Sequence, residues 1–305
     1  MKKLFWCVGI ICFTSMFMIS CAAVENVTKV ATDVGIHAGV ISTSQGESIR
    51  RSAAAGAKSM EDFTPEQEYY IGRSVGAAVL VKYKALSNTK INAYLNVLGQ
   101  TLAKASDMPE LFGGYHFLVL DSDDINAFAT PGGHIFITRG LIRCCRTEDA
   151  LAAVLAHEIG HIQLRHGMKA IEKGRMTEAF TILAQEGAKS FGSQEVAQLT
   201  KTFGGAISDI TNTMINNGYS RSYEYQADAA AVTLLKRIGY NPSALIDMLN
   251  VMDKQMKSGG TDFAKTHPSP QNRIAELRDS GQDFSGNEPP KVRNERFTNA
   301  LGKVL

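Results

Sequence analysis

The spacing of apolar and polar residues divides the chain into predicted elements. Two helices are expected over 65–83 and 88–106, and the second carries apolar side chains at the three- to four-residue spacing of one helix face. Thr64, Pro65 and Gln67 give the first helix a capping residue, a proline in its first turn and a glutamine that can return a hydrogen bond. The folded part of the chain is therefore expected to begin near residue 63.

Residues 115–120 and 134–138 are rich in β-branched and aromatic side chains, which predicts two strands. Between them, residues 127–133 form a tight, glycine-rich bend that contains Pro131. Because proline cannot donate a hydrogen bond to a neighbouring strand, this region is expected at a sheet edge, where an extended peptide could add as a further strand. The alternative is a structural hairpin without contact to a substrate.

The helix predicted over 148–166 carries the strongest chemical signal. It is apolar on several sides and is therefore expected to be buried. His157 and His161 stand four residues apart, so their imidazoles share one helix face and can bind one metal ion. Glu158 lies about 100° further round the helix and reaches the same cleft without displacing a histidine. His166 falls off the metal face and is predicted to be structural.

Two histidines and a glutamate in this pattern indicate metal-dependent hydrolysis of peptides. A catalytic zinc site needs three protein ligands and an open position for water. The metal lowers the pKa of water, and a nearby carboxylate takes a proton as the water attacks a carbonyl. The same pattern also arises by chance, but ionisable groups on a buried helix are costly unless they are paired or bind a metal.

A third ligand is expected on the helix that begins near Ser220. Glu224 and Asp228 lie one turn apart, on a face that borders an alanine-rich stretch. One carboxylate can complete the metal site, and the other can hold the second nitrogen of a ligand histidine or handle protons in the reaction. The alternative is a structural pair between Glu224 and Arg221.

His267 stands in a loop stiffened by prolines, just ahead of a helix that is capped by Ser269. Three roles are open for this histidine. It can take the open position of the metal as a latch, it can stabilise the oxyanion of the reaction, or it can be structural. Further helices are expected over 168–218, as an amphipathic pair, over 241–256 and over 291–304.

Composition places this chain of 305 residues among globular proteins, because 44% of it is hydrophobic and 20% is charged. The formal net charge of +2 falls to about zero once Lys2 and Lys3 of a predicted signal are removed, so nothing in the charge points to a nucleic-acid partner. Cys144 and Cys145 are the cysteines left beyond residue 21, and they are adjacent, so no disulfide framework is predicted.

Residues 1–20 have the charged start and short apolar core of an export signal. Ser20 and Cys21 resemble the lipobox of bacterial lipoproteins, although Met18 departs from its usual leucine. We therefore expect lipid on Cys21 and a tether over 21–62 that lifts the body from a membrane. A plain signal or an uncleaved anchor are the alternatives, and all of them place the body outside the cytoplasm. A lipoprotein would face the periplasm, from the outer membrane rather than the inner one.

Four motifs in this order resemble the M48 family of zinc metallopeptidases over about 65–280. They are Asn126-Ala127-Phe128-Ala129 with Pro131-Gly132-Gly133, then His157-Glu158-x-x-His161, then Glu224-x-x-x-Asp228, and then His267-Pro268-Ser269-Pro270 with Arg273. The resemblance is to the exported, single-domain bacterial kind that is linked to outer-membrane protein quality control. Unlike the members that carry helical repeats, the chain has too little sequence after Ser280 for such an array. Unlike the members that span a membrane several times, it lacks internal membrane helices.

The resemblance implies an α+β fold, a mainly helical, gluzincin-like zincin over 63–280 with a small β-sheet whose edge strand lies over the active-site helix. A tail over 281–305 with a short helix would follow. One Zn²⁺ per chain would be bound by His157, His161 and Glu224, with Glu158 as general base and Asp228 as a proton donor or a support for a ligand. Substrate would contact Asn126, Phe128, Gly132, Gly133 and His134.

We therefore expect a zinc-dependent endopeptidase that cuts exposed segments of unfolded or misassembled envelope proteins, in protein quality control. The alternative is a chaperone-like or binding module that uses the same cleft and sheet edge without cleaving. Glu158 favours the enzyme, because a scaffold needs zinc ligands but no base. A structural zinc domain is disfavoured, because such sites usually fill all four positions with Cys or His. The substrate, the cleavage preference, the oligomeric state and any latency stay open.

Overall fold

The computed structural model describes residues 64–170, 204–205, 207–257, 267–286 and 288–302, with isolated positions before residue 48. The chain divides into two units, 1–62 with 173–204 and 63–172 with 205–305, and every element discussed below belongs to the second unit. The predicted signal, the tether and Cys21 lie outside the described residues, as does most of the helix pair expected over 168–218.

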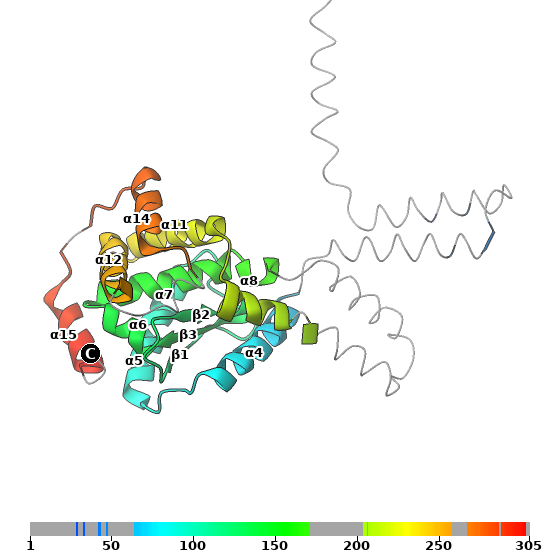
Figure 1. The fold of residues 1–305 in the computed structure, drawn as a ribbon, viewed down its shortest axis with the longest axis horizontal. Helices are drawn as coiled ribbons and strands as arrows, with labels where there is room; N and C mark the ends of the chain where they lie inside the picture. The colour runs from blue at the N-terminus through cyan, green and yellow to red at the C-terminus, as the bar shows by residue number, and fades with distance from the viewer. Residues whose placement is uncertain are drawn as a thin grey trace, which may run out of the picture. The chain divides into compact units, whose positions relative to one another are not determined.

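This unit contains a three-stranded sheet, which lies between helices (Figure 1). Its strands are β1 (His116–Leu120), β2 (Ala127–Ala129) and β3 (His134–Thr138), in the order β1-β3-β2. The central strand β3 pairs parallel with β1 and antiparallel with β2. The sheet edge predicted near Pro131 is therefore confirmed as strand β2. The sequence interpretation of 127–133 as one bend was wrong in its first half, because Ala127–Ala129 pairs with β3 before the chain turns.

The turn between β2 and β3 is the short helix η1 (Pro131–Gly133), and it owes its shape to glycine. Gly132 has φ of 71° and Gly133 has φ of 103°, conformations that residues with a side chain rarely adopt. The turn packs on helix α4 (Pro65–Lys82), where a Cβ on Gly72 would lie 1.6 Å from the Pro131 carbonyl oxygen. Glycine at these positions lets the turn and the helix meet backbone to backbone.

The two faces of the sheet bury different elements, as the alternation of side chains along a strand requires. Ile135 and Ile137 enter the main hydrophobic core together with residues of α5 (Thr89–Lys104) and α7 (Glu148–Gln163). Phe128 lies instead against Tyr83, the residue that ends α4, with 5.3 Å between ring centroids. Helices α4 and α5 confirm the two helices predicted over 65–83 and 88–106.

Helix α7 runs through the middle of the unit, and every residue from Glu148 to Ile162 is buried. Its partners are β2, α5, α11 (Arg221–Arg237) and α12 (Ser243–Lys257), as Figure 1 shows. Gly160 lets α11 approach closely, because a Cβ there would lie 3.0 Å from the Ala227 carbonyl oxygen. This contact places the two chemical motifs of the sequence side by side.

The active-site helix ends earlier than predicted. The sequence suggested a helix to His166, but α7 ends at Gln163 and the short helix α8 (His166–Lys169) follows. Arg165, between them, has φ of 56° and ψ of 35°, which is left-handed backbone. A left-handed residue commonly ends a helix, although it is usually glycine.

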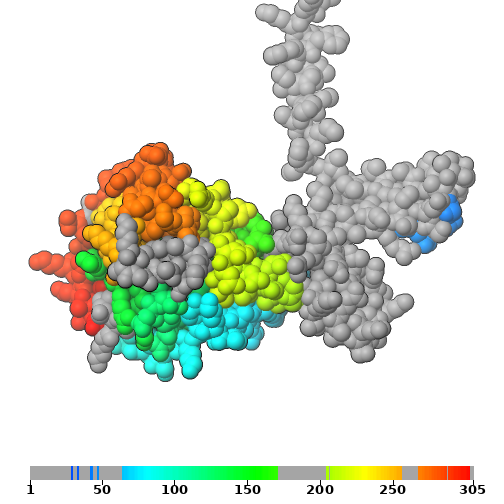
Figure 2. All heavy atoms as spheres, viewed as in Figure 1, coloured from blue at the N-terminus to red at the C-terminus, as the bar shows by residue number. Residues whose placement is uncertain are grey.

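Two C-terminal helices complete the unit. Helix α14 (Pro270–Asp279) contacts α11 and α12, and Figure 2 shows its atoms in orange beside the yellow ones of those helices. Helix α15 (Lys291–Leu301), the predicted final helix, contacts α5 and α7, and its Arg296 binds the buried carboxylate of Glu148. Within the described parts of the chain, no helix combines the length and the apolar character that a membrane span requires.

Candidate metal centre

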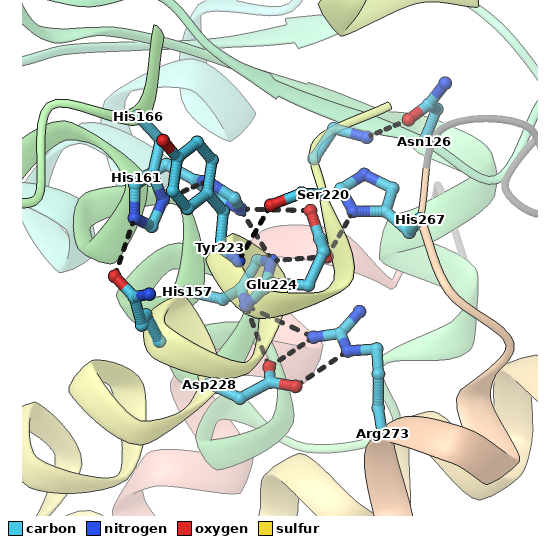
Figure 3. Close-up of polar contacts among 12 residues, drawn as sticks. Asn126, His157, His161, His166, Ser220, Tyr223, Glu224, Asp228, His267 and Arg273 are labelled. Carbon is cyan, nitrogen blue, oxygen red and sulfur yellow. Dashed lines mark hydrogen bonds and ion pairs between the residues drawn. The ribbon is translucent and has the colours of Figure 1, made fainter. Parts of the chain in front are cut away.

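The packing of α7 against α11 brings His157, His161 and Glu224 together (Figure 3). The Nε2 atoms of the two histidines lie 3.1 Å apart. Glu224 sends Oε1 to 3.4 Å from Nε2 of His161 and Oε2 to 3.6 Å from Nε2 of His157. All three side chains are buried. The two histidines lie on α7, and Glu224 lies on α11, more than sixty residues later in the chain.

These three donors fit a zinc ion. At Zn–N and Zn–O distances of about 2.0–2.1 Å, ligand atoms of a tetrahedral site lie roughly 3.3–3.4 Å apart, close to the separations in this cluster. Glu224 Oε1 is buried, yet no donor among the described residues forms a hydrogen bond with it. A cation between the facing nitrogen atoms and this oxygen would satisfy all three groups.

The charges around the cluster support the same donor set. Burial would raise the pKa of Glu224, but His267, His157 and His161 hold this pKa well below its usual value, so the carboxylate is charged. Burial lowers the pKa of His161 to about 3, so its imidazole is neutral. Burial and Arg273 lower the pKa of His157, but Asp228 and Glu224 raise it to about 9, so a metal ion must displace a proton there.

His157 is held from behind by Asp228 and Arg273. Its Nδ1 lies 2.8 Å from Oδ1 of Asp228, which is one turn after Glu224 on α11. Arg273 of α14 donates from Nε to Oδ2 of Asp228 at 2.8 Å, and its Nη2 lies 3.2 Å from His157 Nδ1. Burial would raise the pKa of Asp228, but Arg273 and His157 lower it, so this carboxylate is also charged.

Glu158 lies beside the three donors rather than among them, and the charges of His157, His267 and Glu224 act on its carboxyl. Its carboxyl is buried, and burial raises its pKa above the usual value for glutamate. It lines two small cavities beside strand β2, and His267 lines both of them. A carboxylate with a raised pKa is better matched to proton transfer near neutral pH than an exposed one.

His267, which precedes α14, also contacts the metal centre. Its Nδ1 lies 2.8 Å from Oε2 of Glu224, and donor atoms of His157, Glu224 and His267 all lie within 4.8 Å of one another. The side chain is 8% exposed. His267 is thus close enough to share a metal ion with two of the three proposed ligands.

The five residues predicted to contact substrate fall into two groups. Asn126 and Phe128 belong to the edge of the sheet, where the β2 residues line a cavity together with Glu158 and His267. Gly132 and Gly133 pack on Tyr69 and Gly114, and His134 lies 5.7 Å from the Tyr69 ring, centroid to centroid. The structure thus brings the β2 backbone to the centre and leaves the glycines and His134 beside α4.

Sequence reasoning missed two neighbours of His161. The Tyr219 ring stacks on it at 4.6 Å between centroids. His166 places Nδ1 at 3.0 Å from its Nδ1 (Figure 3). Tyr219 directly precedes the helix cap Ser220, but nothing in that position signals a stacked ring. The role of Arg273 beside Asp228 was equally hidden, because it depends on how α14 packs.

Known proteins resemble part of this chain. The β-barrel assembly-enhancing protease of Escherichia coli (strain K12) is 29% identical over 217 residues, which are 69% of this chain and 42% of that protein. The mitochondrial metalloendopeptidase OMA1 of Schizosaccharomyces pombe is 29% identical over 188 residues, 61% of this chain and 52% of that protein. The metalloprotease LoiP of Escherichia coli (strain K12) is 26% identical over 164 residues, 54% and 62% of the two chains.

The chain thus spans less than half the length of the E. coli β-barrel assembly-enhancing protease. The model of Peptidase family M48 matches residues 89–280, a range that contains the sheet, α7, α11 and α14 with all the residues of the metal centre. The mainly helical α+β fold with a small sheet at the active-site helix agrees with this match. The chain belongs to peptidase family M48.

Proposed function

We propose that this protein is a zinc-dependent endopeptidase that hydrolyses peptide bonds in exposed, extended segments of cell-envelope proteins. The observation that carries the proposal is the cluster of two imidazoles and one carboxylate, with the carboxyl of Glu158 beside it. His157, His161 and Glu224 would hold one zinc ion per chain. When bound in a site with an open position, zinc supplies Lewis-acid polarisation of a carbonyl and lowers the pKa of water.

Glu158 supplies the proton transfers. It accepts a proton from the attacking water and gives a proton to the leaving amine, so one carboxyl serves both halves of the hydrolysis. Its buried position raises its pKa, which makes the protonated form accessible for the second half. Asp228 is held in its charged form by Arg273 and His157. This contact supports a positioning role on His157 for Asp228 rather than proton donation.

The edge of β2 offers a place for an extended substrate. Thr138 N–H donates to Asn126 O at 3.1 Å, and Thr130 N–H donates to His134 O at 2.9 Å. Because such bonds recur at every second residue of an antiparallel pair, Ala127 and Ala129 turn their backbone groups away from β3. The Asn126 side chain accepts from Ala127 N–H at 2.9 Å. The Ala129 N–H and both alanine carbonyls then face the side where a peptide can add as a strand.

Two observations support substrates in the cell envelope. One is the predicted export signal, and the other is the similarity to a protein named β-barrel assembly-enhancing protease. The substrates would be unfolded or misassembled proteins, because only these expose extended segments long enough to pair with a strand. Lipid on Cys21 and the tether over 21–62 would hold the enzyme at a membrane, facing the periplasm, with the outer membrane favoured. The intact mass of membrane-extracted protein tests this anchor, since an unmodified or uncleaved N terminus contradicts it.

His267 is proposed as a latch on the metal centre. All four groups of the reaction, His157, Glu158, His161 and Glu224, are at most 3% exposed, so a peptide carbonyl cannot reach them until something moves. His267 lies beside the donor cluster, where its Nδ1 contacts Glu224. Its imidazole in the remaining metal position would keep the enzyme inactive until a substrate or partner displaces the loop.

The substitution Glu158→Gln tests the function. The variant should keep one zinc ion per chain, because Glu158 is not a ligand, and should lose nearly all cleavage of an unfolded protein substrate. Glu110→Gln makes the same chemical change at an exposed position and should behave as wild type. Zinc lost together with activity would make Glu158 a ligand. If the amounts of envelope proteins are the same in wild-type cells and in Glu158→Gln cells, the non-cleaving, chaperone-like alternative would be favoured.

A further inference from the structure

The ligand His161 has a partner on the side away from the metal cluster. While Nε2 of His161 faces His157 and Glu224, its Nδ1 lies 3.0 Å from Nδ1 of His166. His166 is fully buried, and its ring stacks on Tyr223 with 4.4 Å between centroids and 7° between planes. The contact therefore fixes both the position and the plane of His166 beneath the ligand.

The backbone is bent to make this contact possible. In a continuous helix His166 would lie five residues after His161 and point to a different face. The left-handed conformation of Arg165 breaks the helix and turns His166 back under His161. Such a conformation is uncommon for a residue with a side chain and costs free energy, which the surroundings must supply. Arg165 donates from Nε to the buried Glu68 of α4 at 3.1 Å, which holds the turn in place.

One assignment of protons satisfies the whole chain of contacts. A neutral imidazole carries one N–H, so one of its ring nitrogens donates a hydrogen bond and the other accepts one. If Nδ1 of His161 donates to Nδ1 of His166, then Nε2 of His166 donates to Gln226 Oε1 at 3.4 Å. Gln226 in turn donates to Ser222 Oγ at 3.0 Å. This assignment leaves the Nε2 lone pair of His161 facing the donor cluster.

We propose that His166 is a positioning residue for the metal centre, which fixes the tautomer and the ring orientation of the ligand His161. The inference rests on the zinc site proposed above. It gives the second histidine of the motif the kind of support that Asp228 gives to the first. A hydrogen bond to the far nitrogen of a ligand histidine orients the ring and raises its basicity, and its loss typically lowers metal affinity or activity by about 10–100-fold.

The test compares zinc affinities of full-length variants, measured by competition with a chelator. His166→Phe keeps a flat ring against Tyr223 but removes the nitrogen, so zinc affinity should fall by about 10–100-fold. His166→Gln returns an acceptor and should recover part of that affinity. Met168→Leu changes a buried apolar side chain on the same short helix and should bind zinc as wild type does. The visible spectrum of the Co²⁺-loaded protein should shift in His166→Phe, because the orientation of a ligand changes.

A second pair of variants tests the backbone. Arg165→Gly accepts left-handed backbone without strain and should keep most of the zinc affinity, whereas Arg165→Val resists that conformation and should resemble His166→Phe. Zinc affinities of His166→Phe and of folded Arg165→Val that equal wild type would overturn the proposal. Loss of zinc as complete as in His161→Ala would overturn it too, by making His166 a ligand. A wild-type protein that binds no zinc would instead refute the function proposed above.

Discussion

Asp228 on α11 and Arg273 on α14 form a buried ion pair, and both of them also contact Nδ1 of His157. The pair connects two distant parts of the chain to one metal ligand. Arg273 lies six residues after His267, near the start of the helix that follows this histidine. The orientation of the first ligand and the position of His267 therefore depend on the same contact.

This pair and the three donors predict different costs for two substitutions on α11. Glu224→Ala removes a zinc ligand and should abolish tight zinc binding. Asp228→Ala leaves all three ligands and should weaken zinc binding by about 10–100-fold, as loss of a supporting contact does. It also leaves Arg273 buried without its partner, which should lower the free energy of unfolding by about 3–5 kcal/mol. Chelator competition and chemical denaturation measure the two effects.

Exposed Arg278 on the same helix offers a matched control for the arginine side of the pair. Arg278→Ala should leave both zinc affinity and stability unchanged, whereas Arg273→Ala should reproduce the losses of Asp228→Ala. If Glu224→Ala and Asp228→Ala lose zinc to the same extent, Asp228 becomes a rival of Glu224 as the third ligand, and its assignment as a support is wrong.

Local patterns in the sequence predicted what a single helix can place. The spacing of His157 and His161 determines that both side chains share a face, because the helix period is a local property. The same reasoning paired Glu224 with Asp228. It also gave the cap Thr64, which accepts a hydrogen bond from the third residue of its helix as expected.

Contacts between distant segments explain what the sequence could not predict. The strand Ala127–Ala129 is too short for a periodic signal and exists because β3 pairs with it. The active-site helix was predicted to run to His166, but Arg165 has left-handed backbone and is held by Glu68, from a helix about a hundred residues earlier. The partner of His161 was missed for the same reason, since His166 reaches it only after that break.

The edge of β2 that faces away from β3 predicts that one backbone donor contributes to substrate binding. Ala129→Pro removes the N–H that faces away from β3, and proline is tolerated on an edge strand at such a position. Loss of one hydrogen bond should lower kcat/KM for an extended peptide by about 2- to 10-fold. Zinc affinity should not change, because no ligand lies on β2. Reduced thermal stability with unchanged kcat/KM would show that the edge is structural.

The last prediction concerns His267, which binds Glu224 and stands within reach of the metal position. If it is a latch, His267→Ala opens the site and raises basal cleavage of an unfolded substrate, with zinc still bound by the other three residues. If it stabilises the oxyanion instead, the same substitution lowers kcat by about 10²–10³-fold, the usual cost of removing one such donor. Initial rates at saturating substrate separate the two roles.

We expect the latch, because the burial of Glu158 and of all three proposed ligands leaves a peptide no access while His267 keeps its place. His116→Ala, at an exposed histidine on β1, controls for the general loss of an imidazole and should leave the rate unchanged. A structural His267 would give an unchanged rate and a lower melting temperature. The sign of the change in basal rate therefore decides the role. Of the three roles, only that of a blocking side chain makes the His267→Ala variant more active than the intact protein.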